Sequence, residues 1–286
     1  MPGSSDGRDP CEMPEFHRQG EETGANKMPC MSLAAEYRQQ FRWRPWSQIF
    51  AEVPLEPGQT ILDLGCATGD QARELASRGC HVIGLDGNQE LLDAAAADRP
   101  PNCKFRACDL RNPPHPGIVA DGIWCSFTAA YMIDLVRFLK TWAQFLRVGG
   151  WIAITEVDDL FGHEPLSERT RSLLQGFADD ARGSGRYDFH MGGKLEDCLV
   201  EAGFTVTRVL TLPDQELSFP GAAPAEVVEA WRRRLQRMPG LRRFCPSEFA
   251  QVEEEFLSCL SRPDHVSRAK VITCIATKSD GVGPER

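Results

Sequence analysis

The stretch ILDLGCATGD, residues 61 to 70, carries the pattern on which the fold depends. It joins a short apolar run, residues 60 to 64, to the segment DQARELASRG, whose apolar side chains fall on one helical face. Gly65 and Gly69 lie between the two, where the backbone must turn sharply and a ligand can approach the main chain more closely than a Cβ permits. The stretch therefore predicts a strand, a tight turn and a helix, with a nucleotide-type ligand at the turn.

The alternation of strand and helix continues along the chain. We expect further strands at 81 to 86, 103 to 109, 121 to 127 and 151 to 157, with helices after residue 88 and from about 133 to 146. Short apolar runs separated by helices are typical of parallel strands that crossover helices cover on both faces. The predicted fold class is α/β, with a doubly wound, mainly parallel sheet and helices on both faces.

The second half of the chain predicts a helical insertion before the last strand. The expected elements are helices at 167 to 183 and 193 to 202, a strand at 204 to 212, two amphipathic helical patterns within 222 to 262, and a strand at 269 to 278. A helical excursion between two strands suggests an insertion at the edge of the sheet, where it could form a homodimer contact. Folded over the strand ends, it would instead close a ligand pocket.

Residues 1 to 30 are rich in Gly, Pro, Glu and Ser and contain almost no aliphatic side chains. Such a segment cannot bury enough apolar surface to offset its chain entropy. We therefore expect a disordered tail there and a short one at 279 to 286. Residues 31 to 286 would form a single domain with its core at 59 to 157, on which a short helical segment from about residue 32 would pack.

Charge and composition argue against several classes of partner. The 32 basic and 41 acidic residues give a formal net charge of −9, which repels nucleic acid and anionic membrane surfaces. No apolar stretch approaches the roughly 18 to 20 residues of a membrane span, so we expect a cytoplasmic protein. The 11 cysteines include no C-x-x-C pair, which indicates reduced, buried thiols, with no disulfide frame and no metal site.

Two acidic residues follow the next two strands in register with the glycine turn. Asp86 ends the second strand about 20 residues after Gly65, an offset at which a carboxylate can accept both hydroxyls of an adenosine ribose. Asp109 ends the third strand, where it can take an adenine amino group while Leu110 packs on the ring. Each signal is weak alone, but on three successive strands they indicate one cofactor site.

With these residues in place, residues 59 to 157 resemble the cofactor-binding core of class I S-adenosylmethionine (SAM) dependent methyltransferases. Ala67 stands where many members have a central glycine. The resemblance implies a seven-stranded sheet whose last hairpin is antiparallel, formed by 204 to 212 and 269 to 278. It also implies SAM as the methyl donor, held by Asp63, Gly65, Cys66, Ala67, Gly69, Asp86, Gly87, Asp109, Leu110 and Ser126.

Two other classes compete with this interpretation. A nicotinamide-dependent dehydrogenase would need G-x-G-x-x-G, whereas the spacing from Gly65 is G-x-x-x-G. Asp70 would also place a negative charge beside a diphosphate, while the positive sulfonium of SAM suits an acidic turn. A SAM-binding regulatory protein without turnover is the second alternative.

The acceptor side is expected above the carboxyl ends of the fourth and fifth strands. The candidate catalytic residues are Tyr131 after the fourth strand, Glu156, Asp158 and His163 after the fifth, and His190 in the cluster that contains Tyr187. The carboxylates could bind a cationic acceptor and His163 could act as a base. Acids at loop starts also commonly cap helices or face solvent. Arg42 and Arg44, among aromatic residues, could reach a carboxylate of SAM or substrate, or only be solvated.

These features together predict a SAM-dependent methyltransferase that acts on a small molecule. The carboxylates, arginines and aromatic residues suggest a nitrogen or sulfur atom of an amine-bearing or zwitterionic metabolite as the methyl acceptor. The N-P-P-Y signature of enzymes that methylate amino groups of DNA and some proteins is absent after the fourth strand, in agreement with the acidic charge.

Overall fold

Seven strands form one sheet in the computed structural model, which describes residues 31 to 113 and 118 to 279. The strands are β1 (Thr60–Leu64), β2 (His81–Asp86), β3 (Cys103–Ala107), β4 (Ala120–Ser126), β5 (Leu146–Asp158), β7 (Phe204–Leu212) and β9 (Lys270–Lys278). Their order is β3-β2-β1-β4-β5-β9-β7. Six of the strands run in one direction, and β9 runs antiparallel to them between β5 and β7. The predicted sheet with its antiparallel last hairpin is confirmed. The tail predicted for residues 1 to 30, and most of the one at 279 to 286, lie outside the described residues.

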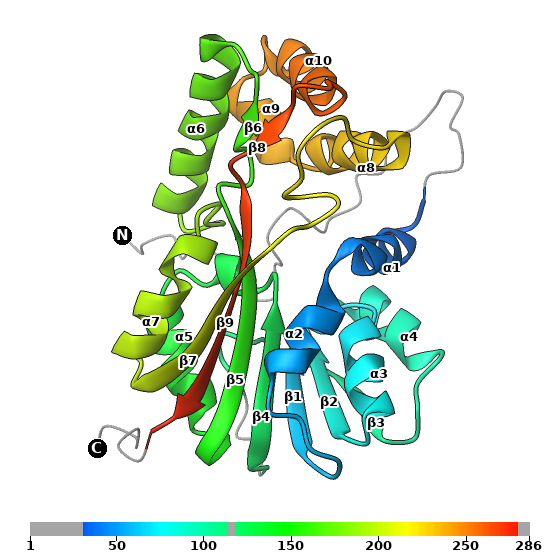
Figure 1. The fold of residues 1–286 in the computed structure, drawn as a ribbon, viewed down its shortest axis with the longest axis vertical. Helices are drawn as coiled ribbons and strands as arrows, with labels where there is room; N and C mark the ends of the chain where they lie inside the picture. Colours follow the sequence, from blue (N-terminus) through cyan, green and yellow to red (C-terminus); the bar gives the residue numbers. More distant parts are fainter. Residues whose placement is uncertain (1–30, 114–117, 280–286) are drawn as a thin grey trace, which may run out of the picture.

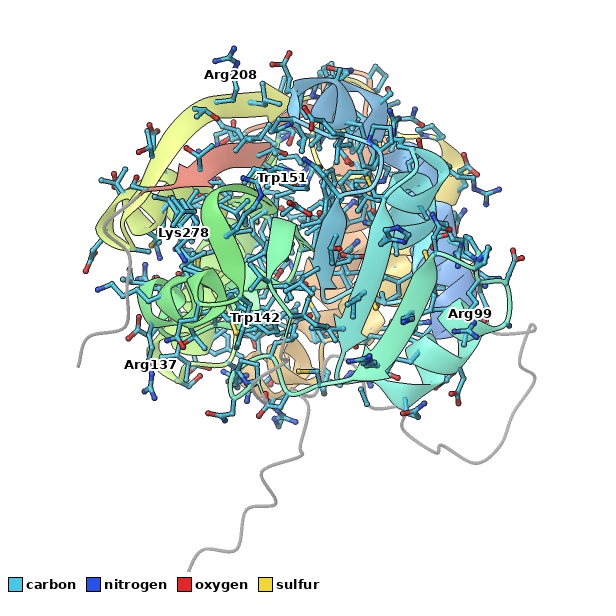
Figure 2. All side chains as sticks on the ribbon, turned by 90° about the horizontal axis from the view of Figure 1, so that it is seen from below. Arg99, Arg137, Trp142, Trp151, Arg208 and Lys278 are labelled. Atoms are coloured by element: carbon cyan, nitrogen blue, oxygen red, sulfur yellow. The ribbon has the colours of Figure 1, made fainter. Side chains whose placement is uncertain are left out.

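Helices cover both faces of this sheet (Figure 1). Those of one face, α2 (Trp46–Glu52) and α3 (Asp70–Ser77), bury Trp46, Phe50 and Leu75 against it. On the other face lie α5 (Leu135–Ala143) and α7 (Leu195–Glu201). Trp151 and Trp142 belong to these two cores and lie on opposite sides of the sheet (Figure 2). Because the central strands are covered on both faces, their sequences are continuous apolar runs without alternation.

The helical segment predicted from about residue 32 is divided in two at Pro45. The first part, α1 (Leu33–Trp43), is capped by Ser32, whose hydroxyl accepts a hydrogen bond from the Ala35 amide at 3.2 Å. Proline lacks an amide hydrogen and disfavours helical geometry in the residue before it, so a new helix, α2, begins after it. The break lets α2 pack on the sheet while α1 lies beside α4 (Gln89–Ala96) and extends above the carboxyl ends of the strands (Figure 1).

A helical cap lies above the carboxyl ends of the strands (Figure 1). It consists of α6 (Glu168–Gly183), α8 (Ala225–Gln236), α9 (Pro239–Phe244), α10 (Phe249–Leu260) and the ribbon of β6 (His163–Glu164) and β8 (Val266–Ser267). These elements share a hydrophobic core around Phe177, Trp231 and Phe256, which extends to Val157 on β5. Of the two placements that the sequence left open for the insertion, the structure has the one over the strand ends and not the one at the sheet edge. Since β7 ends and β9 begins at the carboxyl edge of the parallel strands, the connection between them passes over that edge.

Several possible features of other protein classes are missing from the described part of the chain. Within residues 31 to 113 and 118 to 279, no helix is long and apolar enough to cross a bilayer. The nine cysteines in these segments are all free thiols. The same residues contain no cluster of three or more His, Cys, Asp or Glu side chains with the geometry of a metal site.

Candidate functional site

A cavity of about 450 Å³ opens between the carboxyl ends of the strands and the cap. On the side of β1 to β3 it is lined by the glycine turn and by the residues after β2 and β3, among them Gly65, Ala67, Thr68, Asp86, Gly87, Asp109 and Leu110. On the side of β4, β5 and the cap it is lined by aromatic, apolar and hydrogen-bond-donating side chains, among them Tyr37, Phe127, Tyr131, Leu160, Tyr187, Leu217 and Arg234. We call these parts the cofactor side and the acceptor side.

The turn after β1 is held open for a ligand by backbone geometry. Gly65 has a φ of +76°, and a Cβ on it would meet Thr128 Oγ1 at 2.0 Å, so no other residue fits there. The Gly65 and Cys66 amides both donate to the Leu85 carbonyl, at 2.8 and 3.1 Å, which ties the turn to the end of β2. Ala67, in the place of a glycine, takes a left-handed φ of +43°. The exchange of glycine for alanine is thus accommodated with the turn intact.

Asp86 lies at the end of β2 with both carboxylate oxygens oriented by main-chain amides. Oδ2 accepts from the Ala67 amide at 2.9 Å and Oδ1 from the Asn88 amide at 2.8 Å. The first bond joins this acid to the glycine turn, and the carboxylate reaches the cavity wall. Each carboxylate oxygen has more than one lone pair, so it can accept further hydrogen bonds from a ligand. Such an arrangement suits a pair of ribose hydroxyls.

The third acid, Asp109, lies at the exposed rim of the cofactor side. Its Oδ1 accepts from the Arg111 amide at 3.0 Å, which fixes the start of the loop after β3. Leu110 beside it is buried and lines the cavity. The adenine position predicted between these two residues is therefore a place where an apolar wall meets a hydrogen-bond acceptor.

Asp63 and Ser126 are polar groups beneath this side of the cavity. Asp63 Oδ2 and Ser126 Oγ are buried and have no hydrogen-bond partner among the described residues. Burial, with the nearby carboxylates of Asp86 and Asp70, raises the pKa of Asp63 to about 8. Buried polar groups normally have partners, so these two atoms indicate a polar ligand or water that completes the site.

Three of the predicted cofactor residues do not line the cavity, namely the buried Asp63 and two residues, Cys66 and Gly69, that support the turn. Cys66 is buried and packs under it, and burial raises the pKa of its thiol well above the ordinary value. Gly69 has a φ of +72°, and a Cβ there would meet Phe105 at 2.5 Å. Both residues therefore shape the turn, whereas Gly65, Ala67, Asp86, Gly87, Asp109, Leu110 and Ser126 reach the cavity.

All three tyrosines of the chain line the acceptor side of this one cavity. Tyr37 comes from α1, Tyr131 from the 3-10 turn after β4, and Tyr187 from the loop after α6. The Tyr131 and Tyr187 rings meet edge to face, with centroids 4.8 Å apart. Burial raises the pKa of each phenol above its ordinary value, so the hydroxyls stay protonated at neutral pH. Tyr131 was predicted from the sequence as a site residue and Tyr187 belongs to a predicted cluster, whereas no local pattern assigned Tyr37 to the site.

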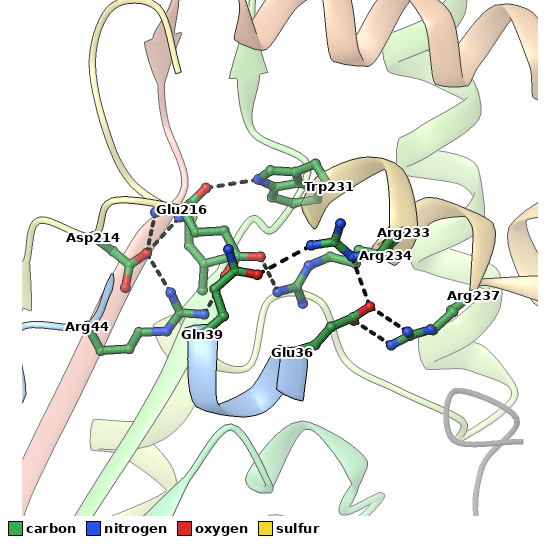
Figure 3. Close-up of polar contacts among 10 residues, drawn as sticks. Glu36, Gln39, Arg44, Asp214, Glu216, Trp231, Arg233, Arg234 and Arg237 are labelled. Atoms are coloured by element: carbon green, nitrogen blue, oxygen red, sulfur yellow. Dashed lines mark hydrogen bonds and ion pairs between the residues drawn. The ribbon is translucent and has the colours of Figure 1, made fainter. Parts of the chain in front are cut away.

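Ion pairs join the cap to the segment after β7 directly above the cavity (Figure 3). Glu216 is fully buried, and its carboxylate oxygens form ion pairs with the guanidinium nitrogens of Arg44 and Arg234, each at 2.6 Å. Asp214 forms an ion pair with Arg44 at 2.9 Å. Although burial alone would raise the pKa of Glu216, Arg234 and Arg44 lower it below its ordinary value. Trp231 Nε1 donates to the Glu216 carbonyl at 2.9 Å. These bonds hold Arg44 and Arg234 at the cavity wall.

A second group of ion pairs connects α1 to α8 (Figure 3). The buried Glu36 accepts from Arg237 through both oxygens at 2.5 Å and lies 2.9 Å from Nε of Arg233. The first described helix is thereby bound to the insertion some two hundred residues later in the chain.

His163, predicted as a base, does not line the cavity. Its ring is buried in the cap, where Nδ1 lies 2.9 Å from Nε2 of His265 and the two rings stack. Burial and the neighbouring His265 lower the pKa of His163 to about 3. The prediction placed it at the strand end from its position in the sequence, but β6 carries it into the ribbon with β8 and away from the acceptor side.

The other acceptor-side candidates also differ from expectation. Asp158 and His190 lie near each other, with Oδ1 and Nδ1 3.7 Å apart, and neither lines the cavity. Glu156 is buried below it and accepts from the Ala130 amide at 3.0 Å. Burial is the main cause that raises the pKa of Glu156 to about 8. Of the five predicted catalytic residues, only Tyr131 lines the cavity, so the carboxylates cannot hold a cationic acceptor there.

The part of the chain that is similar to known protein families includes the cofactor side. Residues 61–150 match the model of a methyltransferase domain family. Trans-aconitate 2-methyltransferase of Agrobacterium fabrum is 34% identical over 121 residues, which make up 42% of this chain and 46% of that enzyme. The chain spans about half the length of the curated relatives that it matches. The family match begins within β1 and ends within β5, so it includes the three strand ends that line the cofactor side.

Solved structures of low identity share the whole fold. Haemonchus contortus phosphoethanolamine N-methyltransferase 2, in complex with phosphomonomethylethanolamine and S-adenosylhomocysteine, is 18% identical with a TM-score of 0.53, covering 85% of this chain and 53% of that one. SpnF, a cyclase, is 18% identical with a TM-score of 0.55, covering 82% of this chain and 80% of that one. At such identities the likeness shows a common fold and carries no statement about activity.

Proposed function

We propose that this chain, which belongs to the class I SAM-dependent methyltransferases, transfers the methyl group of SAM to a small acceptor bound beneath the cap. The observation that carries the proposal is the division of one cavity into two chemically different sides. One side has glycine-turn backbone and carboxylates at the strand ends, and the other has aromatic rings and hydrogen-bond donors under the cap.

The residues of the cofactor side fit SAM. Bound SAM supplies an electrophilic methyl group on a positively charged sulfonium. Asp86 would accept the ribose hydroxyls, and Asp109 with Leu110 would contact the adenine. The orphaned Oδ2 of buried Asp63, beneath this side of the cavity, supports a polar group nearby, as the methionine part of SAM provides. Three carboxylates line this side, those of Asp70, Asp86 and Asp109, which favours a cationic ligand over a diphosphate.

The acceptor would be held against the aromatic wall, close to the turn. Phe127, Tyr131 and Leu160 supply apolar surface, which orients an acceptor and excludes water from the reacting atoms. Thr128 lines the cavity beside Gly65 and joins the two sides. The role of these residues is mainly positioning, since methyl transfer from a sulfonium needs an in-line approach of the nucleophile.

The chemistry of the cavity wall limits the nucleophile. Among the described lining residues the acceptor side has no carboxylate or imidazole that could take a proton, and its tyrosines are protonated at neutral pH. An alcohol or phenol acceptor would need such a base. A nitrogen or sulfur atom whose lone pair is free near pH 7 does not, and we propose these as the acceptor atoms. A carboxylate oxygen also needs no base and is the second candidate, in keeping with the name of the trans-aconitate relatives.

Incubation with labelled SAM and a panel of amine, imidazole, thiol, carboxylate and phenol acceptors tests the proposal. Transfer to nitrogen or sulfur acceptors is the expected result. Transfer to phenols alone would contradict the preference for nucleophiles that need no base. A regulatory protein, or an enzyme that uses the fold for another reaction, would bind SAM in calorimetry and methylate no member of the panel. Binding of NAD in place of SAM would support a dehydrogenase.

A further inference from the structure

The acceptor side of the cavity is rich in hydrogen-bond donors. Arg234 reaches it from α8, and the hydroxyl-bearing side chains of Tyr37, Tyr131 and Tyr187 line it from three other elements. These four groups lie close enough for the charge of Arg234 to lower the pKa that burial alone would give each phenol. A guanidinium and three protonated phenols make a wall that can donate several hydrogen bonds to one group of a ligand.

Two arginines of the ion-pair network in Figure 3, Arg44 and Arg234, line the cavity, and the buried Asp214 and Glu216 balance their charges. The carboxylates that line the cavity within the described residues, Asp70, Asp86 and Asp109, are all on the cofactor side. An anionic group on the acceptor side would therefore meet hydrogen-bond donors and no carboxylate among the described lining residues of that side.

We propose that the methyl acceptor carries an oxyanion, either a carboxylate or a phosphoryl group, which binds to Arg234 and the tyrosine hydroxyls beneath the cap. This inference rests on the proposed function and adds the substrate class. Glu216 holds the guanidinium at 2.6 Å, and the guanidinium carbon lies 5.2 Å from the centre of the Trp231 ring. Both contacts orient the arginine before the acceptor enters, which lowers the entropy lost on binding.

Matched pairs of acceptors test this assignment by calorimetry. The protein is first titrated with S-adenosylhomocysteine, which measures the affinity of the cofactor site without an acceptor. The loaded protein is then titrated with cysteine against cysteamine and histidine against histamine for the carboxylate, and with 2-aminoethylphosphonate against ethylamine for the phosphoryl group. We expect the oxyanion-bearing member of at least one pair to bind at least about 10-fold more tightly, as for one charge-assisted contact. The pair that shows the preference identifies the anion.

Variants of Arg234 and Tyr187 test whether these residues cause the preference for an oxyanion. Arg234→Gln should remove the preference, and Tyr187→Phe, which keeps the ring, should weaken it by about 3- to 10-fold. Arg232→Gln is the control, because Arg232 is an exposed arginine of the same helix that pairs with Glu229 away from the cavity. Tyr187→Phe also serves if Arg234→Gln fails to fold.

The outcomes separate this inference from the function. Equal or tighter binding of the members without an oxyanion, a preference that survives both variants, or no oxyanion binding at millimolar concentration would overturn the oxyanion subsite. Methyl transfer to acceptors without an oxyanion would overturn it while the methyltransferase function stands. Failure of SAM and S-adenosylhomocysteine to bind in the first titration would contradict the proposed function instead.

Discussion

The two sides of the cavity are built in different ways. The cofactor side consists of strand ends and a turn whose main-chain amides bond to Leu85 and Asp86, so its shape depends on local backbone geometry and short contacts between neighbouring strands. The acceptor side depends on α1, the cap and the loop after α6, and long-range ion pairs such as Glu36 with Arg237 hold it together. One side is thus formed by the sheet itself, and the other exists only when distant segments meet. Substitutions on one side should therefore change that side and leave the other side largely unaffected.

The largest effect is expected for Gly65→Val on the cofactor side. The new side chain would meet Thr128 at 2.0 Å and force a β-branched residue to a φ of +76°, so SAM binding should be lost and the free energy of unfolding should fall by about 3 kcal/mol or more. Calorimetry with SAM and urea unfolding measure both. Gly58→Val is the control, since Gly58 has a φ of +87° with no atom within 4 Å of the added Cβ. If both variants bind SAM with equal affinity, the clash with Thr128 is not the cause of a loss of SAM binding.

A pH-dependent effect should follow from Asp63. Its pKa in the folded chain, about 8, lies above the unfolded value near 4, so between these values the folded chain retains a proton that the unfolded chain has released. Stability from this group is thus present below about pH 4 and lost as pH rises toward 8, by about 1.4 kcal/mol per unit. In urea unfolding without SAM, Asp63→Asn should gain about 3 kcal/mol relative to the unsubstituted protein between pH 5 and 7. Parallel stability curves for the two proteins would contradict a raised pKa.

Asp86→Asn should weaken SAM binding by about 10- to 100-fold, through the loss of charge-assisted hydrogen bonds to the ribose. The asparagine retains one oxygen for the amides that Asp86 now binds, so the fold should persist. Calorimetric titration with SAM measures the change. Asp98→Asn, at an exposed position after α4, should bind SAM like the unsubstituted protein. Unchanged affinity in a folded Asp86→Asn protein would remove Asp86 from the site.

Glu36→Gln tests the acceptor side without touching the turn. It leaves Arg233 and Arg237 of α8 without their buried carboxylate, which should destabilise the contact between α1 and the cap by about 1 to 2 kcal/mol. Hydrogen exchange should accelerate in α1 and α8 while SAM affinity changes little. Glu226→Gln, at an exposed position of the same helix, should alter exchange far less. Equal acceleration in β1 to β3 would mean that the two sides are not separable.

The smallest effect is expected for His190→Ala. His190 lies outside the cavity wall, with its imidazole Nδ1 3.7 Å from Asp158 Oδ1, so methyl transfer should change less than 2-fold, within the roughly 0.5 kcal/mol typical of surface substitutions. Turnover with a saturating acceptor measures it. A loss of kcat with KM and stability unchanged would restore His190 as a catalytic residue.

Sequence patterns predicted which residues of the first half of the chain meet at one edge of the sheet, because these residues belong to short elements that place them directly. Gly65, Asp86 and Asp109 each follow a strand whose bounds were predicted to within a few residues, and parallel strands bring their carboxyl ends to one edge. The acceptor side was predicted poorly, because its residues come from distant segments and a position after a strand does not place them. Glu156 and His163 follow β5 closely, but one is buried under the site and the other enters the ribbon in the cap.

What the sequence by itself determined was therefore the sheet, the turn and the acids that suit SAM, since periodicity and glycine spacing are properties of neighbouring residues. Only the tertiary structure decided that the insertion covers the strand ends and that Tyr37, Tyr131, Tyr187 and Arg234 share one wall. These four residues span nearly two hundred positions of the chain. No local pattern links them, because their proximity comes from the burial of the cap core and from the ion pairs between α1 and α8.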